Sequence, residues 1–454
     1  MNEVITKDLL KERLLKGGAW ALGGKVFSVF AGLIINMFLA RMLTPKDFGT
    51  YFLLQTIITF SVTFVVLGFD NGIIKFISEA ISKGKLGEIK IVYTRIFLIV
   101  LVSASIYVLF LNIGIINFLS NLFHSPPILD LKYLIFVWIV FASLQRLTTE
   151  TFRGMHKIDY ATIFGGAIKG GIVYYLLFSV FLIAYYYLNS HYSLFTIVSL
   201  ILISISLSLI FSVYFLLQQD LFKNIKKISK KFQLKEKFFV SFPMLITNLL
   251  LLILSNSDIW IIGIFRNNKE VALYSSAAKL ILLVNSSLIV VNSFLPPIIS
   301  DLYTKNDKKT MEKVVRSSST FAAIPAILSL VILLTFPGYV LNFIFGEFYS
   351  KASLVLIILS LGQLFNVWAG SCGYVLLMTG QQKIMTYIMI VSVLIIIPSG
   401  ILVAEDLGIV GIAIVYASGK IIQNIVMVLF VKKNIGIWTH VHFKVGNIVR
   451  LIKS

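Results

Sequence analysis

Charge and cysteine are scarce in this chain of 454 residues. Charged residues make up only 13% of the sequence, and Cys372 is its single cysteine. One cysteine excludes a disulfide within the chain. The sequence also lacks the GxxxxGK[ST] loop that binds nucleotide phosphates, the HExxH helix of zinc proteases and any cluster of Cys and His with metal-ligand spacing. These absences argue against a P-loop ATPase and a zinc hydrolase, and we expect no enzyme.

Long apolar runs are abundant instead. Hydrophobic residues reach 58% of the chain and the mean hydropathy is +0.93, which is typical of a protein inside a lipid bilayer. A helix that crosses a bilayer needs roughly 20 apolar residues. Twelve runs of suitable length predict an all-α, multi-pass membrane protein: 17–40, 48–69, 92–118, 130–151, 161–188, 194–217, 239–265, 271–298, 318–343, 352–378, 385–404 and 408–431. The first run is too long for a signal peptide, so we interpret it as an uncleaved helix.

Basic residues outnumber acidic ones, 40 against 20. In a soluble protein this excess would suggest nucleic acid as a partner, but its distribution indicates otherwise. The N-terminus, every second loop and the C-terminal tail carry 28 lysines and arginines, whereas the intervening loops carry six. By the positive-inside rule both termini are cytoplasmic. We therefore expect a protein of the cytoplasmic (inner or plasma) membrane that contacts membrane lipids and binds no nucleic acid.

The chain is predicted to consist of two similar halves. Six expected helices at 1–217 and six at 239–431 flank a basic cytoplasmic linker at 218–238, and a basic cytoplasmic tail follows at 432–454. The stretch DFGTY (47–51) is matched 223 residues later by EVALY (270–274): acid, apolar, small, variable, Tyr. With six helices per half, both copies enter the membrane from the same side, so the repeat is parallel. In transporters of this kind the substrate site lies between the halves, and access alternates between the two sides.

Three stretches resemble a known family. RMLTPKDFGTYFLLQTIITF (41–60), LGFDNGIIKFIS (67–78) and SDIWIIGIFRNNKEVALYSSAAKL (257–280) are together similar to polysaccharide flippases of the Wzx type. These belong to the multidrug/oligosaccharidyl-lipid/polysaccharide (MOP) exporter superfamily, and the resemblance covers nearly the whole chain. It implies a MATE/MOP-like fold. A related branch, the lipid II flippases, usually has more helices than the twelve expected here.

The resemblance also implies an activity. Such a flippase moves a polyprenyl-diphosphate-linked oligosaccharide from the cytoplasmic to the outer leaflet by alternating access. The product serves surface polysaccharide biosynthesis, of which O-antigen is one form. Polysaccharide assembly enzymes are then the expected protein partners.

Ionisable residues inside the expected helices are the candidate site residues, because each costs about 2.5–3.5 kcal/mol at a helix centre. The candidate cations are Lys420, Lys279, Lys25, Arg146 and Lys169. Lys420 lies near the middle of its run, and Gln423 and Asn424 share its helical face. A cavity lined by such cations can replace the hydration of a diphosphate with charge-assisted hydrogen bonds. In the alternative interpretation, each cation is paired with an acid or packed for stability alone.

Three acids complete the set of candidates: Asp258, Glu150 and Asp70. Arg146 and Glu150 are four residues apart, so they can pair on one helix face. A carboxylate at Asp258 can bind Na⁺ or a proton and couple a gradient to transport. It can equally anchor its helix against a neighbouring cation. Beyond this option of Na⁺ or H⁺ coupling, we expect no cofactor and no metal site.

Two other functions stay open. An ion-coupled drug or metabolite antiporter of the same superfamily calls for an acid-rich cavity when its drugs are cationic, whereas this chain has more bases than acids inside its helices. A membrane glycosyltransferase or polysaccharide polymerase needs large outer loops that carry acids or arginines. The longest outer loop here, SNLFHSPPILD (120–130), has one acid. The buried bases therefore favour an anionic substrate and the flippase.

Overall fold

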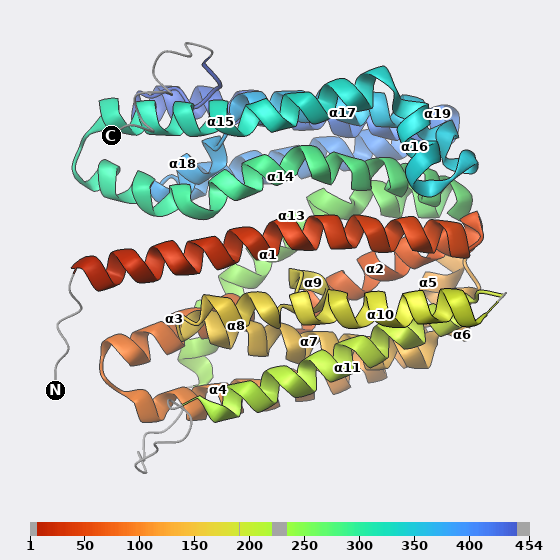
Figure 1. The fold of residues 1–454 in the computed structure, drawn as a ribbon, viewed down its shortest axis with the longest axis horizontal. Coiled ribbons are helices and arrows are strands. Elements are labelled where there is room, and N and C mark those ends of the chain that lie inside the picture. Colours follow the sequence, from red (N-terminus) through yellow and green to blue (C-terminus); the bar gives the residue numbers. More distant parts are fainter. Residues whose placement is uncertain (1–6, 190, 220–233, 443–454) are drawn as a thin grey trace. The chain divides into compact units, whose positions relative to one another are not determined.

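The chain is built from helices. The computed structural model describes residues 7–189, 191–219 and 234–442, and within these ranges it contains no strand (Figure 1). The chain divides into two compact units, Met1–Leu252 and Ile253–Ser454, and each is described by itself. The expected all-α, multi-pass fold is confirmed. The boundary between the units falls within one helix, and most of the expected linker at 218–238 lies outside the described residues.

The described part of unit 1 contains twelve named elements and the start of a thirteenth. They are α1 (Lys7–Met42), α2 (Pro45–Val65), α3 (Phe69–Ser82), α4 (Leu86–Phe110), the π-helical turn η1 (Leu111–Ile115), α5 (Ile116–Leu122), α6 (Pro127–Asp130), α7 (Lys132–Gly154), α8 (Ile158–Ile163), α9 (Gly166–Lys169), α10 (Ile172–Leu188), α11 (Leu194–Gln218) and the first part of α13 (Leu234–Phe265). The central helix is α7, which packs against α2, α3, α4, α8, α9 and α11. This placement explains why α7 carries many of the buried polar residues of the unit.

Unit 2 contains the rest of α13 and seven further elements. They are α14 (Asn268–Thr304), α15 (Lys308–Thr335), α16 (Pro337–Phe345), the 3₁₀ helix η2 (Glu347–Ala352), α17 (Ser353–Ala369), α18 (Cys372–Met378) and α19 (Gln382–Ile435). α14 packs against α15, α17 and α18, and α17 packs against α19. Gly408 has non-helical backbone angles (φ 56°, ψ −146°) and divides α19 into two helices. This division agrees with the separate runs expected at 385–404 and 408–431.

The helices are compatible with twelve membrane crossings. Nine helices among the described residues are long and apolar enough to cross a membrane, with α19 counted once. The other expected crossings correspond to α7, which is more polar, to the shorter α10 and to the second part of α19. Many large apolar side chains are exposed, such as Ile113 at 84% and Leu402 at 78%. Such exposure suits contact with lipid.

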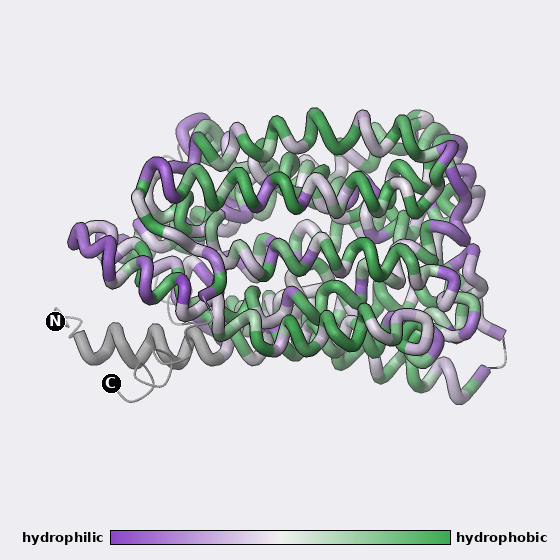
Figure 2. Tube along the Cα trace, turned by 90° about the horizontal axis from the view of Figure 1, so that it is seen from above, coloured by the Kyte–Doolittle hydropathy of each residue, from purple (hydrophilic) through white to green (hydrophobic). Residues whose placement is uncertain are grey.

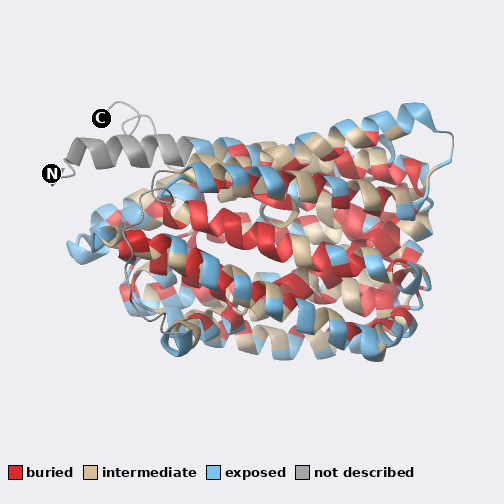
Figure 3. Cartoon of the chain, turned by 90° about the horizontal axis from the view of Figure 1, so that it is seen from below, coloured by how far each residue is buried: buried red, intermediate tan, exposed pale blue. Residues whose placement is uncertain are grey.

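Hydrophobic and buried residues are distributed along the helices in the same way in both units. Hydrophobic residues cover the long sides of the helices, and hydrophilic residues gather near the helix ends (Figure 2). Buried and exposed positions alternate along most helices (Figure 3). The helices thus have one side packed in the protein and one side exposed along their apolar length.

Both copies of the repeated stretch begin a helix with the same type of cap. Thr44 Oγ1 accepts a hydrogen bond from Asp47 N at 3.2 Å and donates one to Asp47 Oδ2 at 2.7 Å. At the start of α14, Asn267 Oδ1 accepts from Glu270 N at 3.1 Å, and Asn267 Nδ2 donates to Glu270 Oε1 at 3.0 Å. In each cap the first bond satisfies a backbone amide group that a helix start would leave free, and the second joins the two side chains. The repeat in the sequence is therefore a repeat of helix-start geometry.

Four expected continuous helices are interrupted. The run 48–69 breaks between α2 and α3, the run 318–343 breaks between α15 and α16, the run 352–378 breaks between α17 and α18, and the run 161–188 breaks at Phe164–Gly171. In the last case Gly166 and Gly170 have φ angles of +65° and +80°, which residues with a Cβ rarely adopt. A Cβ on Gly171 would lie 2.4 Å from the backbone nitrogen of Gly165. The apolar content of 161–188 predicts a membrane crossing, but the backbone angles of these glycines divide the segment into more than one helix.

Neighbouring helices bind the backbone exposed at this break. Gln145 Nε2 and Thr149 Oγ1, both on α7, donate to Phe164 O at 2.5 Å and 2.9 Å. On the other side Ser28 Oγ of α1 donates to Gly170 O at 2.5 Å. A break inside a membrane is tolerated only where its backbone groups find partners of this kind. α7 and α1 therefore hold α8, α9 and α10 in place.

Replacing Gly171 with Ala is expected to destabilise the protein, because the added Cβ would overlap the backbone of Gly165 and Gly166. Overpacking of this kind costs about 1–3 kcal/mol, so the midpoint of thermal unfolding in detergent should fall. Gly23→Ala is the matched control, since nothing lies within 4 Å of a Cβ there. Equal unfolding midpoints for the two variants would contradict the close packing at the break.

Candidate functional site

Arg146 and Asp70 form a buried ion pair in unit 1. Arg146 Nη2 of α7 lies 2.5 Å from Asp70 Oδ2 of α3, and the two residues are only 7% and 2% exposed. Thr63 Oγ1 accepts a second hydrogen bond from Arg146 Nη1 at 2.9 Å, and Asn248 Nδ2 donates to Asp70 Oδ2 at 3.4 Å. A buried pair is favourable only with such geometry and additional hydrogen bonds. This arrangement favours a structural role for both charges over binding of a substrate.

Glu150 lies one turn along α7 from Arg146 and is 1% exposed. Both of its carboxylate oxygens accept hydrogen bonds from Arg153 Nη1, each at 3.3 Å. The sequence offered Arg146 and Glu150 as partners on one helix face. In the structure the salt bridge of Arg146 goes to Asp70, because the packing of α3 on α7 brings a carboxylate from a distant part of the chain beside the guanidinium.

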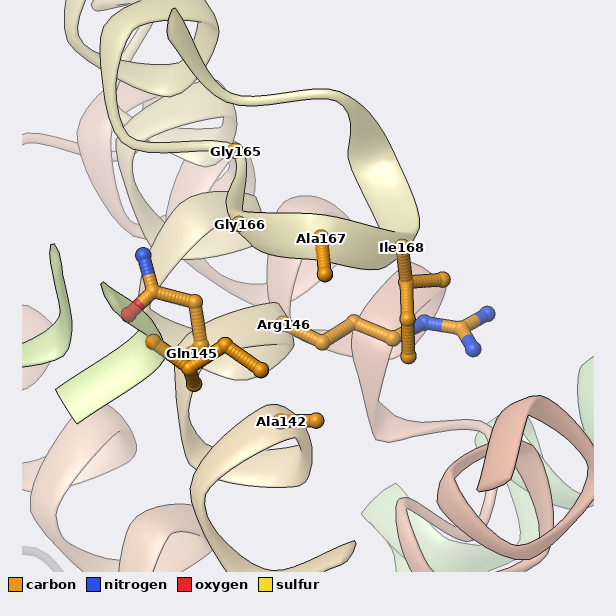
Figure 4. Close-up of a pocket in the computed structure, with 8 residues that line it drawn as sticks. Ala142, Gln145, Arg146, Gly165, Gly166, Ala167 and Ile168 are labelled. Atoms are coloured by element: carbon orange, nitrogen blue, oxygen red, sulfur yellow. The ribbon is translucent and has the colours of Figure 1, made fainter. Parts of the chain in front are cut away.

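A small cavity adjoins this ion pair within unit 1. It is lined by Ala142, Gln145 and Arg146 of α7, by Ile205 of α11 and by Gly165–Ile168 (Figure 4). Its volume is about 10 Å³, which is on the scale of a single water molecule. Arg146 Nε is buried without a hydrogen-bond partner among the described residues. The cavity is far too small for a lipid-linked or drug-sized substrate.

Lys25 and Lys169 belong to neighbouring segments of unit 1. Lys25 is exposed on α1, one turn before Ser28, which donates to the carbonyl of Gly170. The backbone of Lys169 ends α9 at the helix break, but its side chain lies outside the described part of the structure. The structure thus brings the two backbone segments together and leaves the role of Lys169 a prediction.

Lys420 lies in the second part of α19, and its side chain is exposed. The thiol of Cys372, at the start of α18, lies close enough to interact with it electrostatically. Gln423 and Asn424, on the same helical face, are buried at 8% and 6% exposure. No carboxylate lies within ion-pair distance of Lys420 in the described ranges of the chain. Lys420 is therefore a cation in a mostly neutral, polar setting.

Asp258, on α13, is anchored by two hydrogen bonds in unit 2. Tyr274 Oη of α14 donates to Asp258 Oδ2 at 2.9 Å, and Ile259 N donates to Oδ1 at 2.9 Å. Next to it, Tyr416 Oη of α19 donates to Ser257 Oγ at 2.6 Å. Each carboxylate oxygen already accepts a hydrogen bond, so the geometry favours anchoring of α13 over the ion-coupling role.

Lys279 is half-buried on α14, and a row of amides follows it along that helix. Asn285 Oδ1 accepts hydrogen bonds from Gln363 and, at 3.1 Å, from Asn366, both on α17. Asn292 Oδ1 accepts from Ser371 Oγ at 2.6 Å. Sequence reasoning missed these amides because it searched for charge. Their seven-residue spacing on one face of an apolar run could have revealed them.

Comparison with known proteins identifies the family. The family described as "Polysaccharide biosynthesis protein" matches residues 14–303, and the MatE family matches residues 243–402. A membrane protein of Methanocaldococcus jannaschii is 24% identical over 447 residues, which covers 93% of this chain and 85% of that protein. The first match alone spans well over half of the chain.

Solved structures show the fold. A multidrug resistance MATE family transporter of the MOP superfamily, in an inward-facing conformation, has a TM-score of 0.74 at 14% identity and covers 92% of this chain and 98% of that one. The lipid II flippase MurJ, in an inward closed conformation, has a TM-score of 0.68 at 15% identity, with coverages of 90% and 86%. The resemblance in the sequence is confirmed, and the chain is a transporter rather than an enzyme. It belongs to the polysaccharide biosynthesis protein family and has the fold of MOP-superfamily transporters.

Proposed function

We propose that this transporter is a flippase for a polyprenyl-diphosphate-linked oligosaccharide. It carries the substrate from the cytoplasmic to the outer leaflet by alternating access, for use by polysaccharide assembly enzymes. We place it in the cytoplasmic membrane with both termini in the cytoplasm, and assign its two halves to 1–217 and 239–431. The match to the polysaccharide biosynthesis family supports the substrate class.

Lys420 is the observation that carries this proposal. A lysine near the middle of a membrane-crossing helix costs about 2.5–3.5 kcal/mol on insertion, and no carboxylate among the described residues offsets that cost. A diphosphate would supply the missing negative charge, and in a low dielectric its attraction to an ammonium is strong. Tyr416, Gln423 and Asn424 lie one turn from Lys420 on α19, and their hydroxyl and amide groups are neutral, so they do not balance that charge.

The other cations take different parts in the proposal. Lys279 and Lys25 are assigned as further contacts to the anionic substrate, from α14 and α1 respectively. Lys169 is a candidate by its position at the helix break. Arg146 is assigned a structural part, because its charge is balanced by Asp70 at 2.5 Å. A surplus of cations over acids inside the helices suits an anionic substrate better than a cationic drug.

Replacing Lys420 with Ala should reduce flipping of a lipid-linked oligosaccharide in proteoliposomes by at least about tenfold, because one charge-assisted hydrogen bond contributes roughly 1.5–3 kcal/mol. Lys420→Arg should retain most of the rate. Lys433→Ala, which removes an exposed lysine in the last turn of α19, is the control and should flip normally. A wild-type rate in Lys420→Ala, at equal protein content, would refute the assignment of this lysine.

Removing one member of the Arg146–Asp70 pair should destabilise unit 1. Asp70→Ala leaves a buried arginine without its counter-ion, which costs about 3–5 kcal/mol. The double variant Asp70→Leu/Arg146→Met should recover much of this loss, as buried pairs replaced by apolar side chains often do. Thermal unfolding in detergent measures both effects. If Arg146→Met unfolds like the wild type yet fails to bind substrate, the arginine belongs to the substrate site instead.

Asp258→Asn tests whether this carboxylate anchors a helix or couples an ion. Tyr274 can still donate to an amide oxygen, so the variant should fold with a modest loss of stability, about 1 kcal/mol. We expect its flipping rate to respond to a collapsed Na⁺ or H⁺ gradient in the same way as the wild-type rate. A gradient dependence present in the wild type and lost in Asp258→Asn would assign ion coupling to this residue.

A further inference from the structure

We propose that unit 1 holds a separate, neutral binding site that contacts sugar hydroxyl groups of the transported glycan. The inference rests on the proposed flippase function for its ligand, but the residues are different from the cations assigned above. The site consists of Asn36 of α1, Tyr51 of α2, and Tyr174 and Tyr175 of α10. It would bind the glycan, whereas Lys420 would bind the diphosphate.

Asn36 presents an unused hydrogen-bond acceptor in the interior of unit 1. Its Nδ2 donates to Gly32 O at 2.6 Å. Its Oδ1 is buried and has no hydrogen-bond partner in the part of the chain that the structure describes, and the residue is 6% exposed. Buried polar atoms are nearly always hydrogen-bonded, so this acceptor calls for a donor from a ligand or from water.

The hydroxyl group of Tyr175 lies near the helical turn of α1 that precedes this acceptor. A Cβ placed on Gly32, one turn from Asn36, would be 3.5 Å from Tyr175 Oη. The rings of Tyr174 and Tyr175 have centroids 5.3 Å apart. Tyr51, Tyr174 and Tyr175 are all close enough to interact electrostatically with one another. Because α1 packs on both α10 and α2, we group Asn36 with the three tyrosines as one proposed cluster.

The tyrosines offer donors that complement the acceptor. Tyr51 Oη accepts a hydrogen bond from Gln55 Nε2 at 2.5 Å, so its own hydroxyl hydrogen is left to donate. Within the described residues, neither Tyr174 nor Tyr175 has a hydrogen-bond partner for its hydroxyl group. Gln55 and Tyr175 are only half-buried, so part of the cluster is exposed. The site therefore combines several O–H donors with one carbonyl acceptor.

The chemistry of the four side chains selects a neutral ligand. Amides and phenols are uncharged at neutral pH, so the cluster provides no cation for a phosphate and no carboxylate for a cationic drug. A sugar hydroxyl donates and accepts at once and can therefore bond to both kinds of group. A ring edge or face of a partly exposed tyrosine also gives apolar contact area to a bound ligand.

The position of the cluster suits the glycan end of the substrate. Asn36 lies six residues before the end of α1, and Tyr51 lies six residues after the start of α2. At 1.5 Å per residue each is about 9 Å from the turn that joins the two helices. In the proposed topology this turn is on the outer side, whereas Tyr175 lies 13 residues before the end of α10, about 20 Å from it. The proposed site would therefore extend from the outer half of α1 and α2 toward the middle of the membrane.

Binding to the purified full-length protein can separate this site from the diphosphate site. Two probes are needed: oligosaccharide repeat units released by mild acid from the surface glycan of the source cells, and farnesyl diphosphate, a short polyprenyl diphosphate. Tyr175→Phe removes only the hydroxyl, and Asn36→Leu removes the amide at similar volume. Each should weaken oligosaccharide binding by about fivefold to tenfold, the effect of one hydrogen bond, and leave farnesyl diphosphate binding unchanged.

The controls make the result decisive. Tyr187→Phe alters a tyrosine on α10 that is 81% exposed, and it should bind both probes like the wild type. Wild-type protein that binds no oligosaccharide, or variants that bind it normally, would overturn the neutral site and leave water as the partner of Asn36. Lys420→Ala should weaken farnesyl diphosphate binding alone. If it does not, the proposed diphosphate contact fails while the neutral site stands or falls on the oligosaccharide result.

Discussion

The absence of water from a bilayer core is the constraint on which the rest of this structure depends. Every backbone polar group at membrane depth must find its partner inside the protein, which is why helices dominate the described chain. Where glycines break the helix at Phe164–Gly171, side chains of α7 and α1 take over from the helical hydrogen bonds. Polar side chains of α7 therefore hydrogen-bond to the exposed backbone of this break, a role that needs no ligand.

Charges in the two units obey the same constraint in different ways. Arg146 and Asp70 neutralise each other at 2.5 Å and gain further hydrogen bonds from Thr63 and Asn248. Lys420 has no such counter-ion among the described residues, and we propose that its charge binds the transported substrate. We assign a cation with a buried counter-ion to the scaffold and a cation without one to the proposed substrate site. Burial alone does not make this distinction. Neutral groups divide similarly, since Asn285 is hydrogen-bonded to α17 whereas Asn36 Oδ1 has no hydrogen-bond partner in the described ranges of the chain.

Apolar run length was enough to predict the fold class and to separate the last two crossings, which the structure divides at Gly408. The break within 161–188 was not predicted, because hydropathy reports which solvent a segment prefers and says nothing of its backbone angles. The partner of Arg146 could not be predicted from the sequence either. Asp70 lies 76 residues away, and only the packing of α3 on α7 brings it close. The candidate lysines were found because charge is rare in such helices. The neutral cluster that includes Asn36 was missed because tyrosine and asparagine are not rare in such helices.

Gln145 illustrates how support of the scaffold can imitate function. Its amide nitrogen donates to Phe164 O and to Ser208 Oγ at 3.3 Å, while its amide oxygen accepts from Ser212 at 3.5 Å. Few side chains can both donate and accept from one position without adding a charge. Among relatives that share the helix break, selection should therefore hold this glutamine nearly invariant. A survey of invariant polar positions would then rank it beside substrate contacts, although the reason for its retention is a single interrupted helix.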